Sequence, residues 1–299
     1  MDRFEAMRVF VRVVERRSFT LAANDLGLPR STVTDAVKQL EARLGIRLLE
    51  RTTRQVSPTL DGEAHHRRCV SLIADLEDAE GAFGAAKPKG LLRVEVQGTL
   101  ARHFLLPGLP DFFAKYPDIE ISMSEGERWI DLIREGVDCV LRFGILPDSD
   151  MIARRVVTLE RLTCASPAYL DRFGVPAAWD ALEGHRMIGL RSLTTGIVRP
   201  LDFMIGETSQ NVSLPTTISV TGTESYLATA RLGLGLVQVP RFHAADDLAR
   251  GALIQLLPDC PPRPMPVSLL YPRNRQLSPR VRVFLDWVTQ ELASKNALS

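Results

Sequence analysis

Four short polar or charged side chains recur along residues 30–43 at the spacing of one face of an α-helix: Ser31, Thr34, Asp35 and Lys38. The face opposite them is apolar and would contact a core: Val33, Val37, Leu40 and Leu44. A helix with small polar side chains near its start can enter the major groove of DNA and contact base edges. The solvated face of an ordinary surface helix has the same composition, so the flanking segments must decide between these interpretations.

Two shorter helices are expected before this one. The first, residues 3–16, would pack through an apolar stripe at three- and four-residue spacing: Phe4, Met7, Val11 and Val14. Ser18 suits the N-cap of the second helix, because its hydroxyl can accept a hydrogen bond from an amide of the first turn. The second helix, residues 19–26, would end at Gly27, since glycine tolerates the left-handed conformation that ends a helix. It would pack through three apolar residues: Leu21, Ala22 and Leu26.

A two-stranded wing is expected after the third helix. Residues 45–49 and 56–59 favour short strands, and Arg54 lies in the basic segment between them, where it could reach phosphates or a minor groove. Residues 1–60 carry eleven Lys or Arg against seven Asp or Glu, whereas the rest of the chain has a net charge of −3. A basic end on a near-neutral chain favours a polyanionic partner. Residues 1–60, which we call the head, are therefore predicted to form a winged helix-turn-helix that binds double-stranded DNA.

Residues 18–62 resemble, without a gap, the signature of LysR-type transcriptional regulators: SFTLAANDLGLPRSTVTDAVKQLEARLGIRLLERTTRQVSPTLDG. The resemblance implies DNA contacts for five residues: Arg30, Ser31, Thr34, Lys38 and Arg54. One departure stands out, since the family often has Ser-Arg where Thr34 and Asp35 stand here. A carboxylate repels phosphate, so Asp35 either accepts a hydrogen bond from a cytosine amino group or faces away from the DNA, and we favour the second.

A long helix is expected from residue 61 to about residue 85. A seam with 3-4-3-4 spacing runs along it: Cys69, Leu72, Leu76, Ala79 and Phe83. The seam could pack on its own domain, but a partner helix explains an exposed apolar stripe better. We expect residues 61–86 to form a homodimer through the last four seam residues, and residues 87–90 to form a hinge. A dimer would place two recognition helices on an interrupted palindrome, and the resemblance adds a tetramer and contact with RNA polymerase.

The remaining chain alternates strand and helix patterns, which predicts an α/β fold. Three strings resemble the effector domain of the same family in the expected order: DLIREGVDCVLRFG, LATARLGLGLVQVP and LSPRVRVFLDWV. That domain is similar to periplasmic solute-binding proteins and has two lobes joined by two crossover strands. On this basis the effector-binding domain spans residues 91–299, divided into two parts: lobe I, residues 91–160 and 266–299, and lobe II, residues 161–265.

Ligands of open α/β sheets bind beyond the carboxyl ends of strands, where helix starts offer free amides. Hydroxyl groups follow three expected strands, and Arg142 ends a fourth, where it could grip a carboxylate with two hydrogen bonds. A small, anionic effector is therefore expected, although each hydroxyl could also cap a helix and Arg142 could brace a loop. The resemblance implies effector contact for seven residues: Thr99, Leu100, Ser124, Arg142, Phe143, Thr223 and Gln238.

No motif of the sequence predicts catalysis. Residues 233–235 lack the third glycine and the downstream acid of a dinucleotide site, and the chain has no phosphate-binding loop and no GxSxG nucleophile. The four cysteines and five histidines show no metal-ligand spacing, so neither a metal nor a cofactor nor an enzyme activity is expected. No apolar run approaches ~20 residues and no export signal opens the chain, which favours a cytoplasmic protein with no membrane contact.

Two alternatives to an effector-controlled DNA-binding regulator stay open. A redox-sensing regulator would pair two of the four cysteines, although small buried hydrophobic residues are the ordinary role of such cysteines. A solute-binding transport protein would explain the two lobes, but it would explain neither the DNA-binding head nor the missing export signal.

Overall fold

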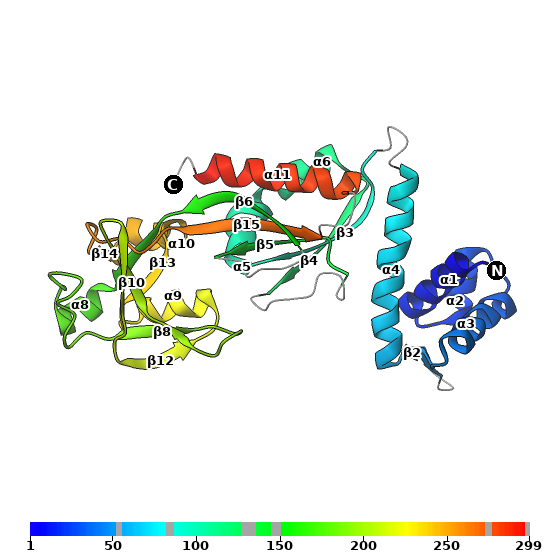
Figure 1. Ribbon diagram of the computed structural model, residues 1–299, viewed down its shortest axis with the longest axis horizontal. Helices are drawn as coiled ribbons and strands as arrows, with labels where there is room; N and C mark the ends of the chain where they lie inside the picture. Colours follow the sequence, from blue (N-terminus) through cyan, green and yellow to red (C-terminus); the bar gives the residue numbers. More distant parts are fainter. Residues whose placement is uncertain (52–55, 82–86, 127–135, 145–150, 273–276, 297–299) are drawn as a thin grey trace.

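The computed structural model describes residues 1–51, 56–81, 87–126, 136–144, 151–272 and 277–296. The head consists of three helices and a hairpin: α1 (Arg3–Arg16), α2 (Phe19–Leu26), α3 (Arg30–Leu44), β1 (Leu49–Arg51) and β2 (Val56–Pro58). The two strands pair antiparallel, from Leu49 opposite Pro58 to Arg51 opposite Val56. This is the predicted winged helix-turn-helix (Figure 1).

Local sequence signals set the ends of these helices. The Ser18 hydroxyl accepts a hydrogen bond from the backbone N–H of Leu21 at the start of α2. Gly27 and Gly45 end α2 and α3 in the left-handed conformation, with φ of 63° and 70°. These contacts lie within one turn of each helix end, which is why the sequence predicts the boundaries closely.

The buried face of α1 differs from the predicted stripe. The predicted residues are only half-buried: Phe4, Met7, Val11 and Val14. The buried face is the neighbouring one: Ala6, Val9, Phe10 and Val13. The long helix α4 (Leu60–Gly81) packs on α1, and the ring of Phe10 on α1 contacts His65 and His66 on α4. Leu21 and Leu44, both expected in the core, are exposed to 52% and 40%, which corrects those two predictions.

The start of α4 fits closely against the hairpin. A Cβ on Gly62 would lie 1.9 Å from the carbonyl oxygen of Leu48, so only glycine permits this approach. One turn earlier, the Thr59 hydroxyl accepts a hydrogen bond from the N–H of Gly62 and donates one to the carbonyl oxygen of Arg47. These contacts fix the direction in which α4 leaves the head.

Lobe I is built on a five-stranded sheet in the order β4-β3-β5-β15-β6. Its strands are β3 (Gly90–Val96), β4 (Ile119–Glu125), β5 (Cys139–Phe143), β6 (Met151–Leu159) and β15 (Met265–Pro272). β3 pairs parallel with β4 and β5, and β15 pairs antiparallel with β5 and β6. Two helical segments cover the sheet: α11 (Pro279–Asn296) and a continuous stretch made of α5 (Gly98–Leu100), a π-helical turn (Ala101–Leu105), a 3-10 turn (Leu106–Gly108) and α6 (Leu109–Lys115).

Lobe II contains two three-stranded sheets, in the orders β13-β7-β14 and β12-β8-β9. Their strands are β7 (Arg161–Ala165), β8 (Met187–Arg191), β9 (Val198–Arg199), β12 (Thr216–Val220), β13 (Val237–Pro240) and β14 (Ile254–Leu256). A hairpin and three helices complete the lobe: β10 (Leu201–Ile205), β11 (Thr208–Val212), α8 (Pro167–Phe173), α9 (Thr223–Arg231) and α10 (Arg241–Ala249). The chain enters this lobe from β6 and returns through β15, so the two lobes are joined by two crossovers (Figure 1).

Several strands of the described chain are absent from the sequence prediction: β6, β9, β10, β11 and β14. β6 is the edge strand of the lobe I sheet, and its Arg154 and Arg155 are exposed, so its sequence lacks the alternation that marks a half-buried strand. The helix predicted for residues 128–134 lies outside the described residues.

Candidate DNA-binding surface and inter-lobe site

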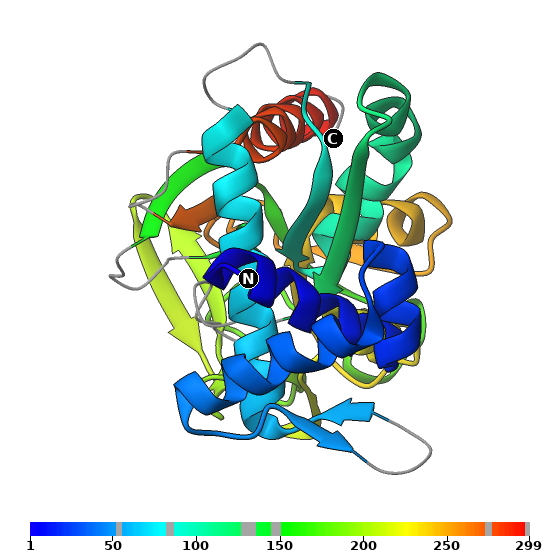
Figure 2. The same cartoon turned by 90° about the vertical axis from the view of Figure 1, so that its right-hand side faces the viewer.

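Four of the five expected DNA-binding residues lie on α3: Arg30, Ser31, Thr34 and Lys38. Arg30, Ser31 and Lys38 are exposed. Thr34 is half-buried, and its hydroxyl donates a 2.9 Å hydrogen bond to the carbonyl oxygen of Arg30. Asp35 is exposed on the same helix. Figure 2 shows α3 and the β1–β2 hairpin along the same edge of the head.

Two arginines of the head are paired with a carboxylate of the head itself. Arg16 donates a hydrogen bond to the carboxylate of Asp25, and Arg12 lies 3.7 Å from the same group. The hydrogen bond from Arg16 lowers the pKa of Asp25 below its ordinary value. These pairs tie α1 to α2. Arg54 lies outside the described residues.

The seam expected on α4 is only partly exposed. Cys69 is fully buried in the core of the head, so the first seam residue, which is not among the four expected to form the dimer, packs on the chain's own domain. Leu72 and Leu76 are 50% and 41% exposed and lie four residues apart on one face of the helix. Ala79 follows in the same helix, and Phe83 lies outside the described residues.

The two lobes touch where a helix of each begins. α5 of lobe I opens after β3, and α9 of lobe II opens after β12. The hydroxyl oxygens of Thr99 and Thr223 lie 3.0 Å apart, within hydrogen-bond distance, although 124 residues separate them in the chain. Thr99 is only 1% exposed. Two of the predicted effector residues therefore meet across the boundary between the lobes.

Charged side chains lie beside the contact between Thr99 and Thr223. Arg102 of lobe I donates a 3.0 Å hydrogen bond to Glu125 of the same lobe and a 3.2 Å hydrogen bond to Glu224 of lobe II. A Cβ on Gly98 would lie 2.3 Å from the Glu125 carboxylate, so the glycine leaves room for the pair. Oε1 of Glu224 also lies 3.2 Å from Nε2 of His243. One carboxylate of lobe II thus faces a guanidinium of lobe I and an imidazole of its own lobe.

Aromatic rings fill the space behind these charges. Phe242 of lobe II packs edge-on against His103 and Phe104 of lobe I, at centroid distances of 5.0 and 4.8 Å. It stacks on Phe143, a predicted effector residue, at 6.2 Å. Behind the charged side chains, the contact between the lobes is therefore largely apolar.

Arg142 has a partner inside lobe I. Its Nη2 donates to Oε1 of Glu95 on the adjacent strand β3, and each of the two side chains is 7% exposed. Gly126 accommodates this pair, because a Cβ there would lie 2.8 Å from the Glu95 carboxylate. Glu95 therefore balances the charge of Arg142. This is a bracing role, which the sequence analysis gave as the alternative to effector binding.

Gln238 is bound within lobe II. Its amide nitrogen donates to the Thr163 hydroxyl and to the carbonyl oxygen of Asp202, and its amide oxygen accepts a 2.9 Å hydrogen bond from the N–H of Asp202. Leu100 is fully buried in the core of lobe I, and the Ser124 hydroxyl donates to the carbonyl oxygen of Val94 at 3.4 Å. Of the predicted set, Thr99, Phe143 and Thr223 belong to the inter-lobe contact.

Sequence reasoning overlooked several residues of this contact: Arg102, Glu125, Glu224, Phe242 and His243. His103 of lobe I also belongs to this contact. The prediction followed strand ends and stopped there, whereas these side chains lie up to one helical turn further along. A search of the six residues after each expected strand for charged and aromatic side chains would have found Arg102 and Glu224.

The comparisons with known proteins decide the family. Residues 4–63 match the family described as bacterial regulatory helix-turn-helix protein, lysR family, and residues 85–293 match the LysR substrate binding domain. The chain belongs to the LysR family of transcriptional regulators. YhjC, an uncharacterized HTH-type transcriptional regulator of Escherichia coli K12, is 36% identical over 96% of this chain and 97% of its own length.

Other relatives span almost the whole regulator as well. An HTH-type transcriptional repressor of Pseudomonas aeruginosa is 36% identical over 99% of this chain and 94% of its own length. Among solved structures, CrgA, a LysR-type transcriptional regulator from Neisseria meningitidis, has a TM-score of 0.60 at 33% identity and covers 96% of this chain and 98% of its own. These matches place the regulator among DNA-binding transcription factors with an effector-binding domain, not among enzymes.

The cysteines of the LysR-family regulator do not favour redox sensing. Cys69, Cys139 and Cys164 are buried. Burial raises the pKa of Cys69 to about 11 and that of Cys164 to about 12, and it raises that of Cys139 as well. Thiols react as thiolates, so burial disfavours the reactive form of these three groups.

Two searches of the described residues concern other functions. No helix within them has the length and apolar character to cross a membrane. No group of three or more His, Cys, Asp or Glu side chains within the same ranges is arranged to hold a metal ion.

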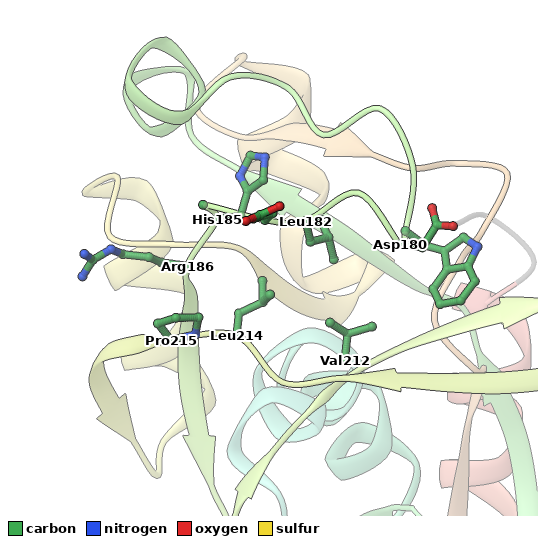
Figure 3. Close-up of a pocket in the computed structure, with 10 residues that line it drawn as sticks. Asp180, Leu182, His185, Arg186, Val212, Leu214 and Pro215 are labelled. Carbon is green, nitrogen blue, oxygen red and sulfur yellow. The ribbon is translucent and has the colours of Figure 1, made fainter.

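A separate pocket of about 540 Å³ lies in lobe II, between the loop before β8 and the segment between β11 and β12. Figure 3 shows Leu182, Val212 and Leu214 pointing into it, with Arg186 directed away. It shares no residue with the contact between the lobes. The charged residues of its lining, Asp180, Glu183 and Arg186, are exposed, whereas the contact between the lobes includes the buried hydroxyl of Thr99, so we favour that contact as the candidate site for a polar effector.

Proposed function

We propose that this regulator binds an interrupted palindrome as a homodimer, and that a small molecule bound between its lobes changes that binding. The observation that carries the proposal is the direct contact of Thr99 with Thr223, which a ligand between the helix starts would replace. Two heads on one dimer supply the symmetry of the DNA site. Assembly into a tetramer, contact with RNA polymerase and action in the cytoplasm are further parts of the proposal.

The proposed DNA contacts are the five residues of α3 and the wing: Arg30, Ser31, Thr34, Lys38 and Arg54. Their exposure on α3 supports direct contact for Arg30, Ser31 and Lys38. Phosphate contacts by the cations would supply affinity, and the short polar side chains would supply discrimination between sequences.

Lys38→Ala is expected to weaken binding to all DNA sequences alike and to reduce the slope of log K against log salt by about 1, because one phosphate contact is lost. The DNA is selected from sheared genomic DNA with the wild-type protein, and binding is measured by fluorescence anisotropy between 50 and 200 mM salt. Lys115→Ala, an equal loss of charge in lobe I, is the matched control. An unchanged salt slope in Lys38→Ala would remove this residue from the interface.

The proposed effector is a small polar molecule held by the hydroxyls of Thr99 and Thr223 and by the backbone amides at the starts of the two helices. The sequence predicts an anionic effector. Because Glu95 balances the charge of Arg142, the backbone amides at the helix starts would have to bind the negative charge of that effector. The coupling between effector and DNA would amount to about 1–3 kcal/mol.

Thr223→Val is expected to weaken effector binding by roughly tenfold, because a lost hydrogen bond costs about 1 kcal/mol or more when its partner stays buried. A compound that raises the Tm of the wild-type protein in a metabolite screen serves as the ligand, and its Kd is measured by calorimetry. Thr229→Val, further along α9, is the control, because its hydroxyl donates only to backbone of its own helix. Equal Kd values for the two variants would count against a site between the lobes.

A further inference from the structure

Two histidine rings meet across the contact between the lobes. His103 comes from the π-helical turn of lobe I, and His243 comes from the first turn of α10 in lobe II. Their ring centroids are 5.7 Å apart at an interplanar angle of 74°. The side chain of His243 is only 3% exposed. The closed arrangement of the lobes therefore holds a titratable ring away from water.

Charged groups from lobe I, α9 and α10 face these rings: Arg102, Glu224, Arg231 and Asp246. Glu224 is shared, since its Oε1 lies 3.2 Å from Nε2 of His243 and accepts a hydrogen bond from Arg102. Arg231 ends α9, and its guanidinium donates a 2.7 Å hydrogen bond to Asp247 of α10. A proton on His243 would thus be attracted by the shared Glu224 carboxylate and repelled by the Arg231 guanidinium.

Burial is the largest influence on both histidines, and it lowers the pKa of each below the ordinary value of 6.5. Glu224 acts in the opposite direction, but its effect is smaller for both rings. Each ring also lowers the affinity of the other for a proton when it is itself charged. Both rings are therefore neutral at pH 7 in this arrangement. Separated lobes would return His243 to water, where it takes up a proton more readily.

We propose that His243, with His103 opposite it, makes the contact between the lobes sensitive to protons, so that acidification separates the lobes. The closed arrangement is favoured above pH 6.5, where the rings are neutral in either arrangement. This preference decreases as the pH falls below 6.5, by at most about tenfold per pH unit for each histidine. A consequence for DNA binding rests on the proposed function, whereas the movement of the lobes does not.

The distance between the lobes tests the proposal directly. Spin labels on Lys115→Cys in lobe I and Asp171→Cys in lobe II, both exposed positions, report that distance by double electron–electron resonance. Cys260→Ser removes the one partly exposed cysteine of the chain, and labelled subunits are diluted with unlabelled protein. The population with separated lobes is expected to rise at least threefold between pH 7.5 and pH 5.5.

Two variants identify the group that titrates. His243→Gln is expected to remove most of the rise, whereas His185→Gln is expected to keep it. His185 is the matched control because burial also lowers its pKa, but its ring contacts Tyr169 inside lobe II. Glu224→Gln is expected to move the midpoint to higher pH, because Glu224 favours the protonated form of His243 in the closed arrangement and accepts a hydrogen bond from Arg102 across the contact between the lobes. Glu224 is half-exposed, so this variant gives a reading even where His243→Gln does not fold.

Three results would overturn the proposal: a distance that is independent of pH, equal responses of the His243 and His185 variants, or a midpoint that Glu224→Gln leaves unchanged or lowers. DNA binding is measured on the same samples without spin labels. Lobes that separate in acid with no change in DNA affinity would keep the proton-sensitive contact and would contradict the proposed coupling to DNA.

Discussion

Leu76→Asp is expected to convert the regulator into monomers and to weaken its binding to a palindromic DNA site by roughly 100-fold or more. Leu72 and Leu76 present exposed apolar side chains on α4, while Cys69 on the same helix anchors it to the head. In a dimer formed along this face, the aspartates of both copies would enter an apolar contact. An unpaired charge buried there is unfavourable, and a second head joined to the first contributes about 10²–10⁴-fold to DNA binding.

Light scattering gives the molar mass of this variant, and a gel-shift titration gives its affinity for DNA. Leu232→Asp is the matched control, because Leu232 is 73% exposed on lobe II and lies far from α4 in the chain. The expected mass is that of one 33.2 kDa chain for Leu76→Asp and that of the wild type for the control. A Leu76→Asp protein with the wild-type mass would show that the subunits associate elsewhere.

The order of elements in the head could be predicted because its signals are local. Ser18 and Gly27 act within one turn of the helix ends that they define. The inward face of α1 could not be predicted in the same way. Apolar residues occupy two neighbouring faces of that helix, and the packing of α4 on α1 determines that Phe10, and not Val11, is fully buried. A long-range contact decided what the local pattern left ambiguous.

In the lobes, too, features set by local sequence could be predicted, whereas features set by contacts between distant residues could not. Thr99 and Thr223 could be identified separately, since each follows a strand and opens a helix. Their meeting across the boundary could not be derived from spacing, and neither could the pairing of Arg102 with Glu224, because more than 120 residues separate the partners. β6 escaped prediction because pairing with β15, distant in the sequence, stabilises it.

The strand pairing of lobe I determines which side chain lies beside Arg142 and therefore which role Arg142 has. At the end of a strand it is well placed for a ligand, and the sequence alone could not show which side chain lies beside it. In the sheet, β3 and β5 run parallel with Glu95 opposite Val140, and the Glu95 carboxylate reaches Arg142. The residue therefore has a structural partner that only the strand order reveals.

Arg142→Ala is accordingly expected to lower the free energy of unfolding by about 3–5 kcal/mol, since it leaves the Glu95 carboxylate buried without its cation. Both side chains are 7% exposed, so solvent compensates little of this loss. Urea denaturation followed by circular dichroism measures the change. Arg154→Ala is the control in the same sheet, because Arg154 is 48% exposed and lies 3.9 Å from an exposed Asp286, and such a pair contributes about 0–1 kcal/mol.

The double variant Glu95→Gln/Arg142→Met separates this structural role from effector recognition. It removes both charges while keeping side chains of similar size, so it should recover much of the stability that Arg142→Ala loses. If the recovered protein still responds to the effector, Arg142 acts by bracing the sheet beneath the contact between the lobes. If stability returns but the response does not, Arg142 contacts the effector directly, and the ion pair with Glu95 describes only the unliganded arrangement.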